Sequence, residues 1–170
     1  TFKGNCYLCN AALSNDTMVI SKQLGVFLNF VHNRFKLTVN GALEDAGFDI
    51  TAEQFLLLDT LWTEGPLAQQ RIAEFMLKDK NSVVKLVDGR EAKRWVRRMA
   101  NPEDRRQNIV ATTEMAEQAR EKVTEVALQA VNRITGGLSD EELTTFIKVM
   151  DRMARNMDDK ADLLEVARKF

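Results

Sequence analysis

The chain has 170 residues, of which 45% are hydrophobic and 29% are charged. This length is enough for one domain or two small ones with a real core, and this composition argues against an intrinsically disordered chain. No apolar run is long enough to cross a membrane, and the first residues lack the layout of a signal peptide, so we expect a cytoplasmic protein.

The net charge of −1 is distributed unevenly along the chain. Residues 78–106 contain ten basic and five acidic side chains, which gives this segment a charge of +5 and leaves −6 for the remainder. A cationic segment within an acidic frame is the footprint expected of a surface that binds phosphate groups. The acidic remainder discourages nucleic acid from binding to any other face.

Residues 1–15 are expected to be an N-terminal extension, and they contain Cys6 and Cys9. A pair of cysteines with this spacing is half of a common zinc site, or a redox pair. Because the sequence has no other cysteine and one histidine, a zinc site would have to be shared between two subunits. A functional redox pair and two ordinary reduced cysteines are the alternatives.

Residues 16–46 have the apolar periodicity of a single long helix, from Val19 to Leu43. About thirty residues at 1.5 Å each give a helix of about 45 Å, too long for a compact domain to cover alone. We therefore expect residues 16–49 to form a dimerisation helix that packs against a second subunit. His32 lies near its middle, where we expect a packed or interfacial side chain, with ligand or pH sensing as the alternative.

Two shorter helices are expected next. Thr51 and Gln54 form a capping box for the first, and Gly65-Pro66 ends it. The second helix, Gln69–Met76, lacks a capping side chain because Ala68 precedes it, so its first turn is expected to fray.

The most informative segment is a short helix from Lys80 to about Glu91. Val83, Leu86 and Val87 follow the spacing of one helix face, and Asp79 is a suitable N-cap. With the preceding helix, this segment forms a helix-turn-helix pattern. Its first two turns offer side chains that can donate to phosphates or to base edges in a major groove: Lys80, Asn81, Ser82 and Lys85.

Two β-prone runs follow, Trp95–Ala100 and Gln107–Thr112, and a charged loop with Pro102 joins them. A helix-turn-helix followed directly by a basic hairpin predicts a winged helix; a small α+β core with solvated charges is the alternative. The fold class is then mainly α with a small β-hairpin wing. A winged helix-turn-helix at residues 50–112 is flanked by long N- and C-terminal dimerisation helices.

Residues 113–170 are expected to supply the C-terminal dimerisation helices. One helix begins at Thr112 or Thr113 and runs to about Ile134. Ser139 and Glu142 form a capping box that opens the next helix, which carries a methionine-rich seam. Such a seam most often fills a core or an interface, and a ligand-binding face is the alternative.

Short motifs occur in a fixed order between Ile50 and Thr113. They are Ile50–Phe55, Leu61-Trp62, Gly65-Pro66-Leu67, Leu86-Val87-Asp88 with Glu91, Val96-Arg97-Arg98 and Asn101–Arg106. In this order and spacing they resemble the MarR family of bacterial transcription regulators. No single motif carries the resemblance alone.

The resemblance implies a sequence-specific transcriptional regulator that binds a pseudo-palindromic operator in double-stranded DNA as a homodimer, under the control of a small, often aromatic ligand. The 80–91 helix would enter the major groove. Arg105 and Arg106 at the wing tip would reach the minor groove or its phosphates, with Asp104 orienting the arginine. Gln69 and Gln70 would hold phosphate at the preceding helix.

Three positions depart from the pattern of the family. Arg90 replaces an apolar residue beside Gly89, so we predict that the 80–91 helix ends early or bends near Gly89 and that Arg90 points out to solvent. Arg94 replaces a glycine at the turn into the first wing strand, where a positive φ is common. Met115-Ala116 replaces Lys-Gly at the start of the following helix.

Other classes of function find less support. The sequence contains no nucleophile–base set and no phosphate-binding glycine loop, so we expect neither an enzyme nor a cofactor. A winged helix can instead serve as a protein-interaction module, and Cys6 with Cys9 would allow a redox sensor. Binding to DNA differs from both because its affinity falls steeply with salt.

Overall fold

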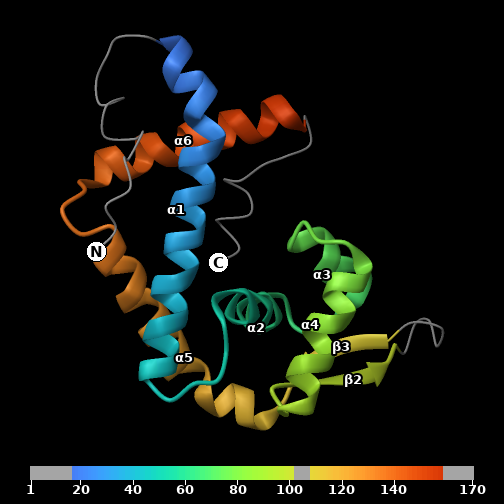
Figure 1. The fold of residues 1–170 in the computed structure, drawn as a ribbon. Coiled ribbons are helices and arrows are strands. Elements are labelled where there is room, and N and C mark those ends of the chain that lie inside the picture. The colour runs from blue at the N-terminus through green and yellow to red at the C-terminus, as the bar shows by residue number, and fades with distance from the viewer. Residues whose placement is uncertain (1–16, 102–107, 159–170) are drawn as a thin grey trace, which may run out of the picture.

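The computed structural model of the chain describes residues 17–101 and 108–158 (Figure 1). Within these ranges, its elements in chain order are α1 (Thr17–Asp45), α2 (Ala52–Glu64), β1 (Leu67–Ala68), α3 (Gln69–Phe75), α4 (Lys80–Ala92), β2 (Val96–Ala100), β3 (Asn108–Thr112), α5 (Glu114–Ile134) and α6 (Asp140–Met157). The fold is mainly α with a small sheet, as predicted. In the described part of the chain, no helix is both long and apolar enough to span a bilayer.

Figure 1 shows two groups of elements, with α1, α5 and α6 on one side of the molecule and α3, α4, β2 and β3 on the other. The α2 helix lies between them. The long helix α1 has 29 residues, a length of about 44 Å, and its C-terminal part packs against α5 and α2. The expected long first helix is therefore confirmed.

The sheet has three antiparallel strands in the order β1-β3-β2. The hairpin pairs Val96 with Thr112 at its base and Ala100 with Asn108 at the far end of the paired segment, which confirms the predicted wing strands. The third strand, β1, pairs Leu67 with Val110 and was not predicted. A strand of two residues has no alternation of its own, so only the β3 partner defines it.

The core lies where the helix-turn-helix meets the sheet and α5. Its fully buried side chains come from most elements of the winged helix and from α5, among them Leu57, Leu58, Ile72, Val83, Val87, Val96, Val110 and Val123. Burying one such aliphatic side chain contributes about 1.5–3 kcal/mol. This shared core fixes α4 against the wing and against the start of α5.

Helix boundaries follow the predicted caps. The capping box of Thr51 and Gln54 opens α2, and the box of Ser139 and Glu142 opens α6. Ala68 precedes α3 without a side-chain cap, as expected. The side-chain oxygen of Thr113 accepts a hydrogen bond from the N–H of Ala116 and so caps α5.

The helix α4 does not end early near Gly89, as one form of our prediction had it, but continues to Ala92. A glycine costs up to about 1 kcal/mol in a helix interior. Here the N–H of Trp95 donates to the carbonyl of Arg90 at 3.0 Å, and Val87 is fully buried beneath this turn. The local backbone bond and the burial of Val87 hold the last turn in place.

Candidate nucleic-acid interface

The first turn of α4 is organised by Asp79. Its carboxylate accepts a hydrogen bond from the backbone N–H of Ser82 at 3.0 Å and from the Ser82 hydroxyl at 2.5 Å. These bonds, that of the hydroxyl first, hold the pKa of Asp79 below its usual value. The predicted N-cap is confirmed. Because the Ser82 hydroxyl proton is used within the protein, only its lone pairs face an outside partner.

One face of α4 is buried in the core and the other is exposed to solvent. Val83 and Val87 are fully buried, whereas Asn81, Lys85 and Asp88, which are spaced by four and three residues, are exposed. Lys80 is exposed at the start of the same helix. The predicted reading side chains Lys80, Asn81 and Lys85 therefore lie on the solvent side of one rigid helix.

The exposed face of α4 also carries an acidic residue, and a strand residue neutralises it. The guanidinium of Arg98 on β2 forms ion pairs with Asp88, at 2.5 Å, and with Glu91. The backbone N–H of Arg98 also donates to the Glu91 carboxylate, at 2.9 Å. We name Arg98, Asp88 and Glu91 the wing clamp.

The wing clamp joins the wing to α4 and pairs with Arg98 the two carboxylates that would repel a phosphate. Arg98 belongs to the cationic segment, but its role in the wing clamp was not predicted from the sequence. The signal was present, since Asp88 and Glu91 are three residues apart on one helix and a basic strand follows them.

Gln69 and Gln70, the predicted contact residues of α3, differ in exposure and in hydrogen bonding. Gln70 is exposed and donates to the Glu74 carboxylate at 3.4 Å. The amide nitrogen of Gln69 is buried and has no hydrogen-bond partner in the described part of the chain. Arg71 forms an ion pair with Glu74 and lies over the ring of Phe75 at 5.5 Å from its centroid. Of the two predicted glutamines, only Gln70 offers its side chain to solvent.

The turn between α3 and α4 is tied to α2. Lys78 in this turn forms an ion pair with Glu53 in the first turn of α2, and the hydrogen bond from Lys78 holds the pKa of Glu53 below its usual value. Leu77 in the same turn has a φ of +48° and is 90% exposed. The turn is therefore held by Lys78, while Leu77 packs against little.

The turn from α4 into β2 confirms one expectation and corrects another. Arg94 has a φ of +62°, as expected for a position that favours glycine. Arg90 does not point to solvent, because it is 4% exposed and its Nη1 donates to the backbone carbonyl of Asp49 at 2.7 Å. Burial lowers the pKa of this guanidinium. The outward prediction failed because this carbonyl, distant in sequence, lies within reach of the inner face of α4.

Several predicted residues are not on this surface. Arg105, Arg106 and Asp104, at the wing tip, lie outside the described residues, as do Cys6 and Cys9. His32 is exposed on α1, on the side of Glu53, whose pKa it helps to lower together with Lys36. The interpretation of His32 as a packed side chain does not hold within this single chain.

A comparison with models of protein families matches residues 50–107 to the MarR family. The described part of this range, residues 50–101, contains α2, α3, α4, β2 and the wing clamp. Over residues 50–107, the chain is of the MarR type. The family comprises DNA-binding transcription regulators. A comparison with curated proteins gives no match.

Solved structures of other proteins share the fold beyond the matched segment. A cysteine-to-serine mutant of MarR from E. coli in complex with operator DNA is 21% identical, with a TM-score of 0.72 over 83% of this chain and 99% of that one. BpsR of Bordetella bronchiseptica, whose DNA binding is regulated by 6-hydroxynicotinic acid, is 22% identical, with a TM-score of 0.69 over 77% and 98%. Reduced AbfR bound to DNA is 25% identical, with a TM-score of 0.67 over 83% and 96%.

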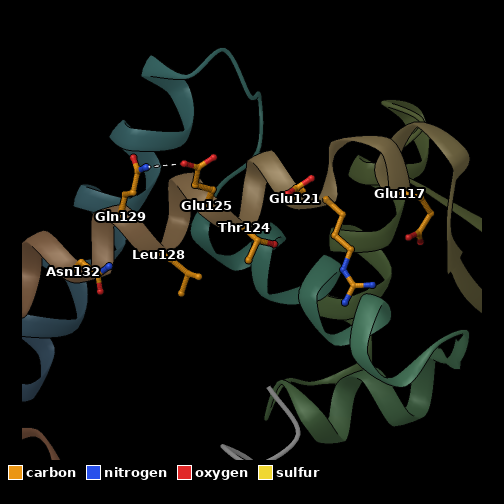
Figure 2. Close-up of a pocket in the computed structure, with 8 residues that line it drawn as sticks. Glu117, Glu121, Thr124, Glu125, Leu128, Gln129 and Asn132 are labelled. Carbon is orange, nitrogen blue, oxygen red and sulfur yellow. Dashed lines mark hydrogen bonds between the residues drawn. The ribbon is translucent and has the colours of Figure 1, made fainter. Parts of the chain in front are cut away.

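Beyond this MarR-family segment, the chain has an open hollow of about 630 Å³ along α5 (Figure 2). Leu128 is its one aliphatic lining residue, and Gln129 donates to Glu125 at 3.1 Å across its wall. Its charged lining residues are Glu117, Arg120, Glu121 and Glu125. Sites for aromatic ligands are usually enclosed and mostly apolar. In a single chain, this hollow is open to solvent and therefore lacks the enclosure of such a site.

Proposed function

We propose that this protein is a transcriptional regulator that binds an operator in double-stranded DNA as a homodimer, with α4 of each subunit in a major groove. The observation that carries the proposal is the solvent-facing row of Lys80, Asn81 and Lys85 above the buried Val83 and Val87. Membership of the winged helix in the MarR family and the DNA-bound states of similar proteins support it.

The side chains of α4 suit different contacts. Lys80 and Lys85 bind phosphates or the acceptor edge of guanine, and Asn81 suits the paired donor and acceptor of adenine. Ser82 serves as an acceptor only, because its proton is directed to Asp79. Gln70, at the start of α3, contacts a backbone phosphate.

The wing is the second proposed contact. Arg105 and Arg106 would follow the minor groove or its phosphates, with Asp104 orienting the arginine. The Gln69 side chain, whose nitrogen is buried, is the weakest member of the predicted set.

The homodimer would use the elements outside the winged helix. We assign residues 16–49 and 113–170 to dimerisation and residues 50–112 to DNA. Large apolar side chains are exposed on α1 and α6 in the single chain, among them Phe30, Val31, Phe146 and Val149. A two-fold axis through these helices would place the two α4 helices about 34 Å apart, one turn of DNA.

Control by a small ligand is the last part of the proposal. Regulation of BpsR by 6-hydroxynicotinic acid supports an aromatic effector. The ligand would bind between the winged helix and the dimer helices and act through different affinities for two dimer geometries. A redox role of Cys6 and Cys9 stays an alternative route of control.

Selection of bound duplexes from a random pool tests the proposal, and a pseudo-palindromic consensus is the expected result. The logarithm of affinity for that consensus should fall linearly with the logarithm of salt concentration. Lys85→Ala should reduce this slope by about one for each subunit. Lys122→Ala, an exposed lysine on α5, is the matched control and should leave the slope unchanged. Recovery of no enriched sequence would overturn the proposal.

A further inference from the structure

The loop between α1 and α2, residues 46–51, is held by the C-terminal end of α4; we name it the corner loop. Asp49 in this loop accepts two bonds from α4. Its backbone carbonyl accepts from Nη1 of Arg90 at 2.7 Å, and its carboxylate forms an ion pair with Lys93 just beyond the helix. Two cations at the C-terminal end of α4 are thus directed toward the corner loop.

An aromatic contact also joins the corner loop to the segment that follows α4. The rings of Phe48 in the corner loop and Trp95 at the start of the wing meet edge to face, with centroids 6.4 Å apart. Trp95 is buried, and its N–H donates to the carbonyl of Arg90 at 3.0 Å. The corner loop therefore contacts α4 through a directional bond, an ion pair and an aromatic pair.

The corner loop is in turn fixed to α1. The N–H of Phe48 donates to the carbonyl of Leu43 at 2.9 Å, and Leu43 is fully buried. The side-chain oxygen of Asn40 on α1 accepts from the N–H of Ala52, at the start of α2, at 2.7 Å. A shift of α4 against α1 would have to break this series of contacts.

If packing alone is considered, an arginine at position 90 is less favourable than an apolar residue. The side chain is 4% exposed, and its Nε is buried without a hydrogen-bond partner among the described residues. A buried charge with incomplete hydrogen bonding is often less stable than an apolar side chain of similar volume. A hydrogen bond nevertheless defines direction and distance, whereas an apolar contact tolerates sliding.

We propose that Arg90 and Lys93 are positioning residues that set the placement of α4 relative to α1. In a dimer joined through α1, this placement fixes the separation of the two α4 helices. The contacts to Asp49 thereby determine which half-site spacing an operator must have. This inference rests on the proposed function.

The test uses the full-length protein and the consensus duplex obtained by selection, together with duplexes whose central spacer is one base pair longer or shorter. Each step moves a half-site by about 3.4 Å and rotates it around the DNA axis. The wild-type protein should prefer one spacing. Arg90→Met retains the apolar volume, removes the directional bond, and should reduce that preference about fivefold, a change of the size one altered base contact produces.

A second variant and a control keep the test decisive. Lys93→Gln keeps Arg90 in place, loosens only the ion pair, and should reduce the preference in the same direction. Lys122→Gln is the matched control and should change nothing. Thermal unfolding of each variant establishes that it is folded, and Arg90→Met should unfold at the same temperature as the wild-type protein or higher.

The outcomes distinguish failure of the positioning role from failure of the proposed function. Equal losses of affinity on all three spacers, with the preference unchanged in both variants, would overturn the positioning role and leave the proposed function intact. Failure of the wild-type protein to bind any of the selected duplexes would overturn the proposed function, and the positioning role with it.

Discussion

Leu77 has the least favourable backbone in the helix-turn-helix, because its φ of +48° brings the Cβ of an ordinary residue close to the following carbonyl. Its side chain recovers little of this cost, since it is 90% exposed. We expect Leu77→Gly to raise the free energy of unfolding by about 1 kcal/mol, measured by urea denaturation.

The matched control for Leu77 is Leu128→Gly, at an exposed leucine in the regular helix α5. There the glycine should lower the free energy of unfolding by up to about 1 kcal/mol. If Leu77→Gly also lowers it, the left-handed turn stores no strain.

Asp59 on α2 gives a pH-dependent prediction. Burial raises the pKa of this half-buried carboxyl above its ordinary 3.8, while the charge of Arg120 acts in the opposite direction. A raised pKa in the folded state means that the protonated form is favoured by folding. The contribution to stability is complete below pH 3.8 and is lost as the pH rises through the folded pKa.

Asp59→Asn imitates the protonated form at every pH. It should raise the unfolding temperature at pH 7 and leave it nearly unchanged at about pH 3, where the native carboxyl is also neutral. Glu141→Gln, at an exposed carboxyl in the first turn of α6, is a control without this pattern. An equal effect of Asp59→Asn at both pH values would assign the change to packing rather than to charge.

At the scale of secondary-structure elements, Thr113 joins the end of β3 to the start of α5. Its hydroxyl oxygen accepts from the N–H of Ala116 at 3.3 Å, and the hydroxyl donates to the carbonyl of Arg94 at 2.6 Å. Thr113→Val keeps the shape and removes both bonds. We expect a loss of about 1–2 kcal/mol in the free energy of unfolding.

Urea denaturation compares Thr113→Val with Thr63→Val, at an exposed threonine in the last turn of α2. The control should change the free energy of unfolding by less than about 0.5 kcal/mol. Equal effects of the two substitutions would mean that the hydroxyl of Thr113 has no capping role.

Elements with local signals were predictable from sequence, and elements without them were not. Caps such as Asp79 and Ser139 act within one turn, so the starts of α4 and α6 could be read directly. The strand β1 has two residues and exists through its partner β3, which lies more than forty residues later. The boundaries of the large elements were therefore found, and the third strand was missed.

The residues of the candidate site, too, were predictable only where the signal lies within one segment of the sequence. Lys85 and Asn81 were assigned from helix periodicity, which a single segment contains. The wing clamp of Arg98 and the burial of Arg90 depend on which distant groups lie within reach, and sequence spacing does not contain that information. Arg90 was assigned to solvent because a buried arginine is rare without a partner. The backbone carbonyl that accepts its bond leaves no mark in the sequence.

For the molecule as a whole, the arrangement of exposed apolar side chains predicts a dimer that a single charged substitution can dissociate. Phe146, Val149 and Met157 share one side of α6 and are exposed in the single chain. Phe146→Glu would place a carboxylate in the proposed interface, where an unpaired charge is strongly unfavourable. We expect light scattering to detect a monomer, and operator affinity to fall because two half-sites are no longer bound together.

The control for the dimer is Lys148→Glu, an exposed residue whose position on the helix turns it away from Phe146. This variant should remain a dimer. A Phe146→Glu protein that is still dimeric and binds the operator normally would show that α6 lies outside the interface.

The carboxylate of Asp79 has one more consequence for α4. Amino ends of helices commonly attract anions through their unbonded N–H groups, but here the chain's own acid occupies that position. In the proposed complex, a phosphate that approaches this end would meet the long, flexible side chains of Lys80 and Lys85 instead of a rigid row of amides. Because these side chains are flexible, their contacts with phosphates would adapt to small changes in groove width. The core would hold the backbone of the helix rigidly at the same time.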